Sequence, residues 1–188
     1  EITSLKLENA LIVFMDNKYD FNGELIFRYN DEYQIELLNI IVESIDLPSS
    51  LTLRGGGINL HGNQVIVSNL IANSDWLSGS INGKYNLEDI KQISGMLVID
   101  NFTYEVEGGR SINVRECSLE VKNIHNTPYI IIKTNIDYQD NILFNIHMNG
   151  RLKDEFVLID SSVINVDGER VKLTGKINLK KYSWEASI

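Results

Sequence analysis

The sequence has little of the two residues that most often interrupt or cross-link a chain. Of its 188 residues, 2 are proline and 1 is cysteine. So little proline permits long uninterrupted strands, because proline removes a hydrogen bond from a β-ladder. The single cysteine, Cys117, excludes a disulfide within the chain and a metal site built from several cysteines. We expect Cys117 to be a small buried apolar residue.

Basic runs and long hydrophobic runs are also missing. The chain carries 17 Lys+Arg against 26 Asp+Glu, a formal net charge of −9. Such an acidic chain is poorly suited to the phosphate backbone of nucleic acids, and equally to charge-driven docking on an anionic membrane. No apolar run approaches the roughly 20 residues of a membrane-spanning helix. The hydrophobic content of 43% nevertheless excludes disorder by composition.

What the sequence does contain is strand signals. Apolar residues alternate with polar ones over residues 77–87, 142–152, 170–179 and 182–188, which is typical of half-buried strands. Turn signals stand at 61–64, 107–110, 138–141 and 167–170. No amphipathic helix of ordinary length is present, and residues 86–92 predict at most one helical turn or a loop. The sequence therefore predicts an all-β antiparallel meander of about a dozen strands.

Two segments depart from simple alternation. Residues 65–72 are apolar on both sides: strict alternation puts Val65, Val67 and Ile71 on one face, and Ile66, Leu70 and Ala72 on the other. Such a strand is covered on two sides or lies where the sheet bends. Between Val114 and Cys117 the apolar parity shifts by one residue, which predicts a β-bulge.

A hairpin pattern recurs along the chain. "INLHGNQVIVSN" from Ile58 matches "INVDGERVKLTG" from Ile164 in its apolar positions and its turn, and "LKLENALIVFMD" from Leu5 is a weaker copy. A glycine that opens an alternating strand follows each copy, namely Gly79, Gly175 and Gly23. The spacing is irregular, so the chain is not a fixed-period solenoid. We expect one all-β domain over residues 1–188, as a segment of a longer repetitive protein.

An apolar sheet face must be covered, and three architectures can cover it. Two sheets can pack as a sandwich, one sheet can close as a barrel, or a curled sheet can leave a slot for an apolar ligand. Glycines within the apolar rows mark bends or close backbone approach, which favours a β-taco, a groove or an open barrel-like sheet. These glycines are Gly79, Gly83, Gly95, Gly150 and Gly175.

The apolar rows supply the candidate site. Whether they enclose a dry core or an acyl slot is left open by the pattern. The residues expected to face the interior are Leu77, Ile81, Tyr85, Ile93, Leu97, Ile99, Ile142, Phe144, Ile146, Met148, Val171, Leu173, Ile177 and Trp184.

Part of the chain resembles a known superfamily. The run "LTLRGGGINLHGNQVIVSNLIANSDWLSGSINGKYNL" followed by "ISGMLVIDNFTYEVEGG" is similar to repeats of the AsmA/TamB superfamily, with a weaker echo over residues 163–179. The resemblance implies a β-groove in the periplasm of a double-membraned bacterium, within a membrane-anchored parent protein. It also implies phospholipid transport between membranes or support of outer-membrane assembly, without a cofactor.

Residues that could suggest catalysis or metal binding have a plainer interpretation. Ser74 and Asp75 follow an asparagine in a turn-forming sequence, and no nucleophile-elbow motif surrounds Ser74. The three histidines His61, His125 and His147 lack metal-ligand spacing. The acidic residues after position 153 lack a calcium-loop pattern and indicate a solvated face; they are Asp154, Glu155, Asp160, Asp167 and Glu169. We predict no catalytic residue, no metal and no enzymatic activity.

Three functions remain from the sequence. The first is a lipid-accommodating module that holds phospholipid acyl chains on its apolar face, with adjoining β-segments of the same protein or an envelope partner continuing the sheet. The second is a structural module that binds a protein through an edge strand. The third is a carbohydrate-active protein, which would require a cleft with paired carboxylates and exposed aromatic residues.

Overall fold

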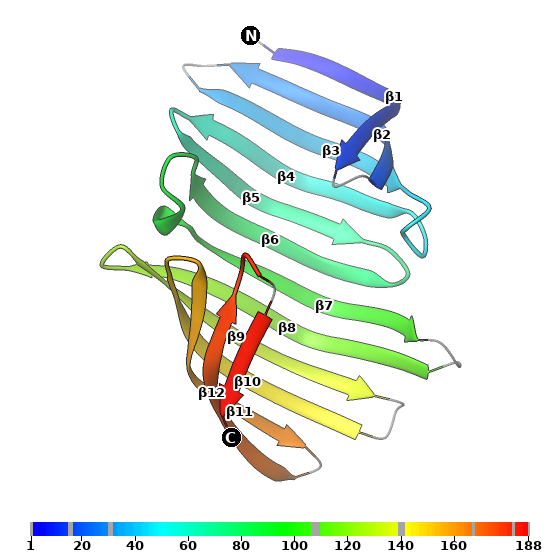
Figure 1. The fold of residues 1–188 in the computed structure, drawn as a ribbon. Coiled ribbons are helices and arrows are strands. Elements are labelled where there is room, and N and C mark those ends of the chain that lie inside the picture. The colour runs from blue at the N-terminus through cyan, green and yellow to red at the C-terminus, as the bar shows by residue number, and fades with distance from the viewer. Residues whose placement is uncertain are drawn as a thin grey trace. The chain divides into compact units, whose positions relative to one another are not determined.

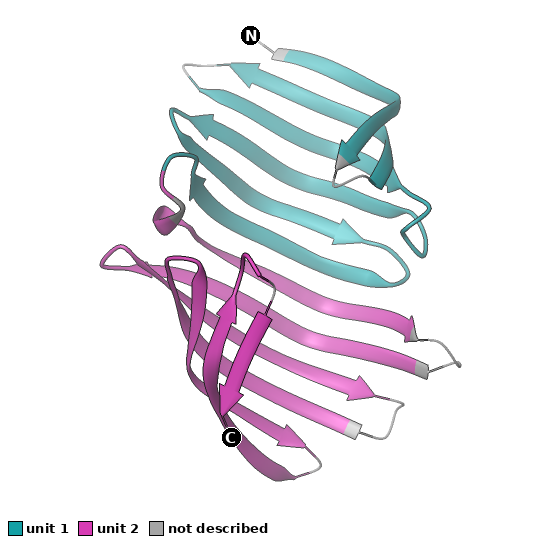
Figure 2. Ribbon diagram, in the orientation of Figure 1, with its two compact units in different colours: residues 1–88 teal, residues 89–188 magenta. Residues whose placement is uncertain are grey.

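The computed structural model describes residues 2–14, 17–29, 32–106, 110–138, 142–166, 168–181 and 183–187. These residues form thirteen β-strands and one short 3-10 helix (Figure 1). The chain divides into two compact units, Glu1–Glu88 and Asp89–Ile188 (Figure 2). Residues 107–109, 139–141 and 167, which belong to three of the predicted turns, lie outside the described part of the chain.

Unit 1 is an antiparallel meander in which each strand pairs with the next one in sequence. Its strands are β1 (Ile2–Phe14), β2 (Asn17–Tyr29), β3 (Tyr33–Glu43), β4 (Leu51–His61), β5 (Gln64–Asn73) and β6 (Leu77–Asn86).

Unit 2 continues the same pattern after η1 (Ile90–Gln92), the 3-10 helix. Asp89 caps this helix by accepting a hydrogen bond from the backbone N–H of Lys91 at 3.0 Å, so the predicted helical turn near residues 86–92 is confirmed. The strands are β7 (Ser94–Val106), β8 (Arg110–Ile124), β9 (Thr127–Tyr138), β10 (Ile142–Lys153), β11 (Phe156–Val166), β12 (Glu169–Asn178) and β13 (Ser183–Ser187).

The predicted all-β class and the open meander are confirmed. Within each unit, the described residues of the first strand do not pair with those of the last strand, so neither sheet closes into a barrel. In Figure 1, β1 turns sharply near its middle, and β12 and β13 run at a steep angle to β7 and β8 of the same unit. Each unit is therefore an open, bent sheet.

β-Bulges produce part of this bending. The pairing register shifts between Leu7 and Ala10 in β1 and between Val67 and Leu70 in β5. A third shift lies between Arg115 and Ser118 in β8, which confirms the bulge predicted between Val114 and Cys117. Because each bulge inserts one extra residue, it bends the strand and increases its twist.

Two bulges of unit 1, in β1 and β5, share one local design. Asn9 and Asn69 both have φ of 51°, a left-handed conformation that asparagine tolerates better than most residues. The backbone N–H of Asn9 donates to Oδ1 of Asn22 at 2.8 Å, and that of Asn69 donates to Oδ1 of Asn82 at 2.7 Å. An amide on the next strand therefore satisfies the N–H that each bulge removes from the ladder.

Strand glycines allow neighbouring backbones to approach closely. A Cβ atom at Gly23 would lie 2.1 Å from the carbonyl oxygen of Asn39, and one at Gly175 would lie 2.2 Å from that of Glu185. At Gly150 the corresponding distance, to the oxygen of Leu158, is 2.7 Å. The expectation that glycines within the apolar rows mark close backbone approach therefore holds at Gly150 and Gly175.

The bulge at Asn69 corrects one expectation. Strict alternation placed Leu70 and Val67 on opposite faces of the strand. The register shift instead brings Val67 and Leu70 to the same face, and leaves Ile66 and Ile71 on the other. Both sides of β5 look apolar in the sequence because, after the extra residue, odd-numbered and even-numbered positions exchange the faces to which they point.

Candidate functional site

One face of unit 1 is almost entirely apolar. Paired residues share a face of the sheet, so the register identifies the members of this face strand by strand. They include Leu5, Leu7, Phe21, Leu25, Phe27, Ile35, Leu37, Ile40, Val42, Leu53, Ile58, Leu60, Val65, Val67, Leu70 and, from the predicted row, Leu77, Ile81 and Tyr85. We call this surface the unit 1 apolar face.

Unit 2 has a face of the same kind. The register connects Leu97, Leu119, Ile132 and Met148 across four strands, and Ile177 with Trp184 across two. The predicted residues that it gathers on this unit 2 apolar face are Leu97, Ile99, Phe144, Ile146, Met148, Val171, Leu173, Ile177 and Trp184.

Of the remaining predicted residues, one lies outside this face, and the side chain of the other is not described. Ile93 lies half-buried between η1 and β7, outside the ladders. Ile142 pairs with Tyr138, and its side chain lies outside what the structure describes.

The two faces are open rather than covered. Among the described residues, the buried hydrophobic side chains are Ile40, Val42 and Val157. Most other members of the faces are half-buried, and Trp184 at the edge of unit 2 is 74% exposed. Cys117, expected to be buried, is likewise only half-buried. Neighbouring side chains cover one another partly, and most side chains of the two faces keep part of their surface exposed.

The opposite face of unit 2 carries a ladder of amides. Asn165 donates to Oδ1 of Asn145 at 3.4 Å, Asn145 donates to Oδ1 of Asn135 at 2.6 Å, and Asn135 donates to Oε2 of Glu116 at 3.2 Å. The ladder crosses β11, β10, β9 and the bulge of β8. We call these four residues the amide ladder.

A hollow of about 440 Å³ lies at the amide ladder. Lys133 and His147 add polar groups to its wall, and the buried hydroxyl of Thr134, also in the wall, has no hydrogen-bond partner among the described residues. The hollow mixes donors, acceptors and both charge signs, without the paired carboxylates that glycoside hydrolysis needs.

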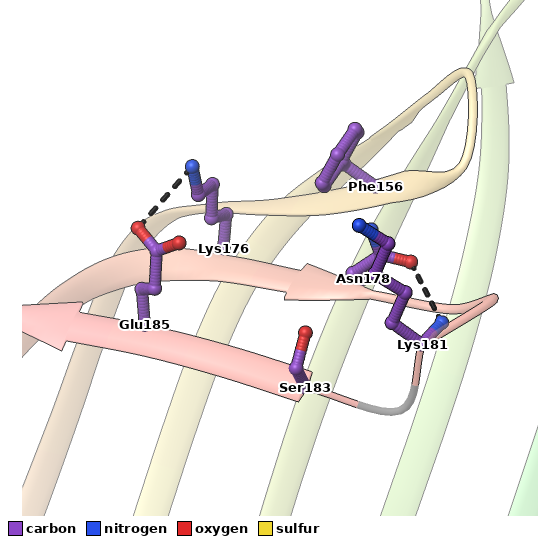
Figure 3. A pocket seen from close by; sticks show the side chains of 6 residues that line it. All are labelled: Phe156, Lys176, Asn178, Lys181, Ser183 and Glu185. Atoms are coloured by element: carbon purple, nitrogen blue, oxygen red, sulfur yellow. Dashed lines mark hydrogen bonds and ion pairs between the residues drawn. The ribbon is translucent and has the colours of Figure 1, made fainter.

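A second hollow, of about 200 Å³, lies at the C-terminal hairpin of β12 and β13 (Figure 3). The ammonium of Lys176 lies 5.9 Å from the ring centre of Phe156 and 3.2 Å from Oε2 of Glu185. The buried Asn178 accepts hydrogen bonds from the backbone N–H groups of Lys180 and Lys181, both at 2.9 Å. These two bonds fix the turn between β12 and β13 and place Lys181 at the hollow.

The residues that could suggest hydrolysis are not brought together. Ser74 Oγ accepts from the backbone N–H of Leu77 at 2.9 Å in the turn between β5 and β6. His61 is the last residue of β4 and pairs with Gln64, at the opposite end of β5. His61 Nδ1 lies 2.6 Å from Oε1 of Glu32. The geometry at Ser74 is that of a turn.

The described residues contain no group of three or more His, Cys, Asp or Glu side chains that could hold a metal ion. Within the same residues, no helix is long and apolar enough to cross a membrane. No protein-family model, curated protein or solved structure matches this chain. The AsmA/TamB resemblance therefore stays a hypothesis.

Proposed function

We propose that the protein is a non-enzymatic module that accommodates phospholipid acyl chains on its apolar faces. One observation carries this proposal: long rows of large apolar side chains lie on one face of each sheet, yet only three hydrophobic residues are buried among those described. Removal of apolar surface from water contributes about 25 cal/mol per Å². A half-exposed face of this length therefore favours an apolar ligand that lies along it.

The chemistry of the faces fits acyl chains. The rows on β5, β9 and β10 present mainly branched aliphatic side chains, such as Val65, Ile132 and Ile146. They offer contact area without a convergent set of polar groups, which suits a flexible apolar chain rather than a ligand recognised by hydrogen bonds. Head groups would remain in water at the open side. In a bacterial envelope, such a module would serve phospholipid transport between membranes or outer-membrane assembly.

A matched pair of substitutions on one strand tests the proposal. Ile132 belongs to the unit 2 apolar face, and its neighbour Ile131 points to the opposite side of β9. Ile132→Asn would place an amide among the acyl chains and is expected to weaken binding of a phospholipid with a fluorescent acyl chain about tenfold. Ile131→Asn, the control, is expected to leave binding within twofold.

Two readouts decide the result. Fluorescence titration gives the affinity, and mass spectrometry of lipid extracted from the purified protein gives the natural occupant. A wild-type protein that carries no lipid and does not bind the probe contradicts the proposal. Equal losses in the two variants contradict the assignment of the face.

A structural module that binds a protein through an edge strand is the second candidate. β13 pairs with Thr174–Asn178 of β12, so among the described residues the first half of β12 has a ladder partner on one side only. Such an edge can accept an added strand. Failure of acyl binding, with protection of these amides from exchange by a partner strand, would favour this candidate.

A further inference from the structure

The C-terminal hairpin is the one strongly basic part of an acidic protein. Residues 168–187 contain 5 Lys+Arg and 2 Asp+Glu, whereas the whole chain contains 17 and 26. Three of these cations, Arg170, Lys172 and Lys176, alternate along the polar side of β12, and Lys180 and Lys181 form the turn. The net charge of the chain conceals this local excess.

Exposed apolar side chains accompany the cations. Leu179, which precedes the two turn lysines, is 46% exposed. Trp184, which follows them in β13, is 74% exposed and, as the partner of Ile177, lies on the side of the hairpin opposite to Lys176. Tryptophan and lysine together are typical of surfaces that sit at the membrane interface, because the indole ring prefers the headgroup region and the ammonium pairs with phosphate.

The hollow beside the turn suits a phosphate headgroup. Lys176, Lys181 and Ser183 line it and can all donate hydrogen bonds (Figure 3). Acidic neighbours are present: Glu185 pairs with Lys176 at 3.2 Å, and Glu155 pairs with Lys180 at 3.0 Å. One partner of each pair is largely exposed, Glu185 at 76% and Lys180 at 78%, so each lysine can exchange its carboxylate for a lipid phosphate.

We propose that the β12–β13 hairpin is a docking surface for anionic phospholipid bilayers, with Lys180 and Lys181 on the headgroups and Trp184 in the interface. This role does not rest on acyl binding, since it needs only the hairpin. If both proposals hold, the hairpin places the open edge of the unit 2 apolar face beside a membrane, because Trp184 belongs to both surfaces.

Vesicle sedimentation of the full chain tests the docking surface. Wild-type protein is expected to bind vesicles of phosphatidylcholine with phosphatidylglycerol at least about tenfold more tightly than vesicles of phosphatidylcholine alone. The double variant Lys180→Gln/Lys181→Gln is expected to lose about tenfold of this binding. A matched pair of exposed unit 1 lysines, Lys18→Gln/Lys84→Gln, is expected to change it less than twofold.

Tryptophan fluorescence gives a second readout. A blue shift on anionic vesicles is expected in wild type and in Trp76→Phe, and is expected to be absent in Trp184→Phe. Three results would overturn the proposal. They are equal binding to both vesicle types, equal losses of binding in the two double lysine variants, and binding of inorganic phosphate by a protein that does not bind vesicles. Acyl-probe binding in vesicle-free solution is a separate measurement, so the failure of one proposal is distinguishable from that of the other.

Discussion

The two units maintain one apolar and one polar side by different means. In unit 1, two bulges rest on single asparagines, each satisfied by one amide on the next strand. In unit 2, β9 and β10 pair without a register shift, and four side chains form a continuous amide ladder across their polar side. Single hydrogen bonds thus support two bulges of unit 1, whereas in unit 2 a network that begins at the β8 bulge supports the polar side across four strands.

Charge separates the units as well. Unit 1 contains 5 Lys+Arg and 12 Asp+Glu, and unit 2 contains 12 and 14. Nearly half of the unit 2 cations belong to the hairpin of β12 and β13. The acidic character of the chain therefore belongs mainly to unit 1, and a partner that recognises positive charge would meet the β12–β13 hairpin of unit 2.

The largest expected effect is a loss of stability on substitution of a strand glycine, and it should differ between Gly23 in unit 1 and Gly175 in unit 2. Gly23→Val would drive a side chain into the backbone of β3 within unit 1, at a residue whose φ of 150° already disfavours side chains. We expect a loss of about 3 kcal/mol in the free energy of unfolding, measured by urea denaturation.

Two controls sharpen this result. Gly175→Val makes a comparable clash, but only against the 5-residue strand β13, so we expect β13 to detach, with loss of amide protection there and little global change. Gly57→Ala, whose Cβ would have no atom nearer than 3.9 Å, is expected to stay within about 0.5 kcal/mol of wild type. If Gly23→Val and Gly175→Val lose the same free energy of unfolding, the expected difference between the two sites is contradicted.

The next effect concerns the amide ladder. Asn145→Ala removes the central amide, which both donates to Asn135 and accepts from Asn165. We expect a loss of about 2 kcal/mol in thermal or urea unfolding. Asn149→Ala, on the same side of β10 with one longer bond to Ser161 at 3.4 Å, is the matched control and is expected to lose less than half as much. Similar losses would show that the ladder adds nothing beyond single bonds.

The smallest effect tests the bulge at Asn69 in unit 1. Asn69→Ala would place alanine at φ of 51° and is expected to cost about 1 kcal/mol, because the left-handed conformation disfavours a Cβ atom. Asn69→Gly keeps the backbone N–H that bonds Asn82 and removes the strain, so its stability is expected to equal or exceed that of wild type. The midpoints of urea unfolding show whether each variant is more or less stable than wild type. If Asn69→Gly is less stable than Asn69→Ala, the strain explanation is contradicted.

Much of the fold followed from periodicity. Alternation predicted the strands, and the parity shift from Val114 to Cys117 predicted the β8 bulge because polar residues on the other side made the shift visible. The bulge at Asn69 was missed because Ile66 and Ile71 lie on the side of β5 opposite to the apolar face. With apolar residues on both sides of the strand, the change of parity could not be seen in the sequence. The amide ladder left only a faint signal: Asn135 and Asn145 lie at equal distances from the turn near residue 140, which is what cross-strand pairing requires.

The sequence by itself determined which side of each strand is apolar, because side chains alternate with a period of two whatever the sheet later does. It also placed the cluster of cations at the C-terminal end. Only the tertiary structure decided that these apolar faces stay half-exposed. Burial depends on whether the sheets meet a second layer, and no local pattern encodes that. Register decided the rest, because a single inserted residue, as at Asn69, exchanges the faces of everything that follows it in the strand.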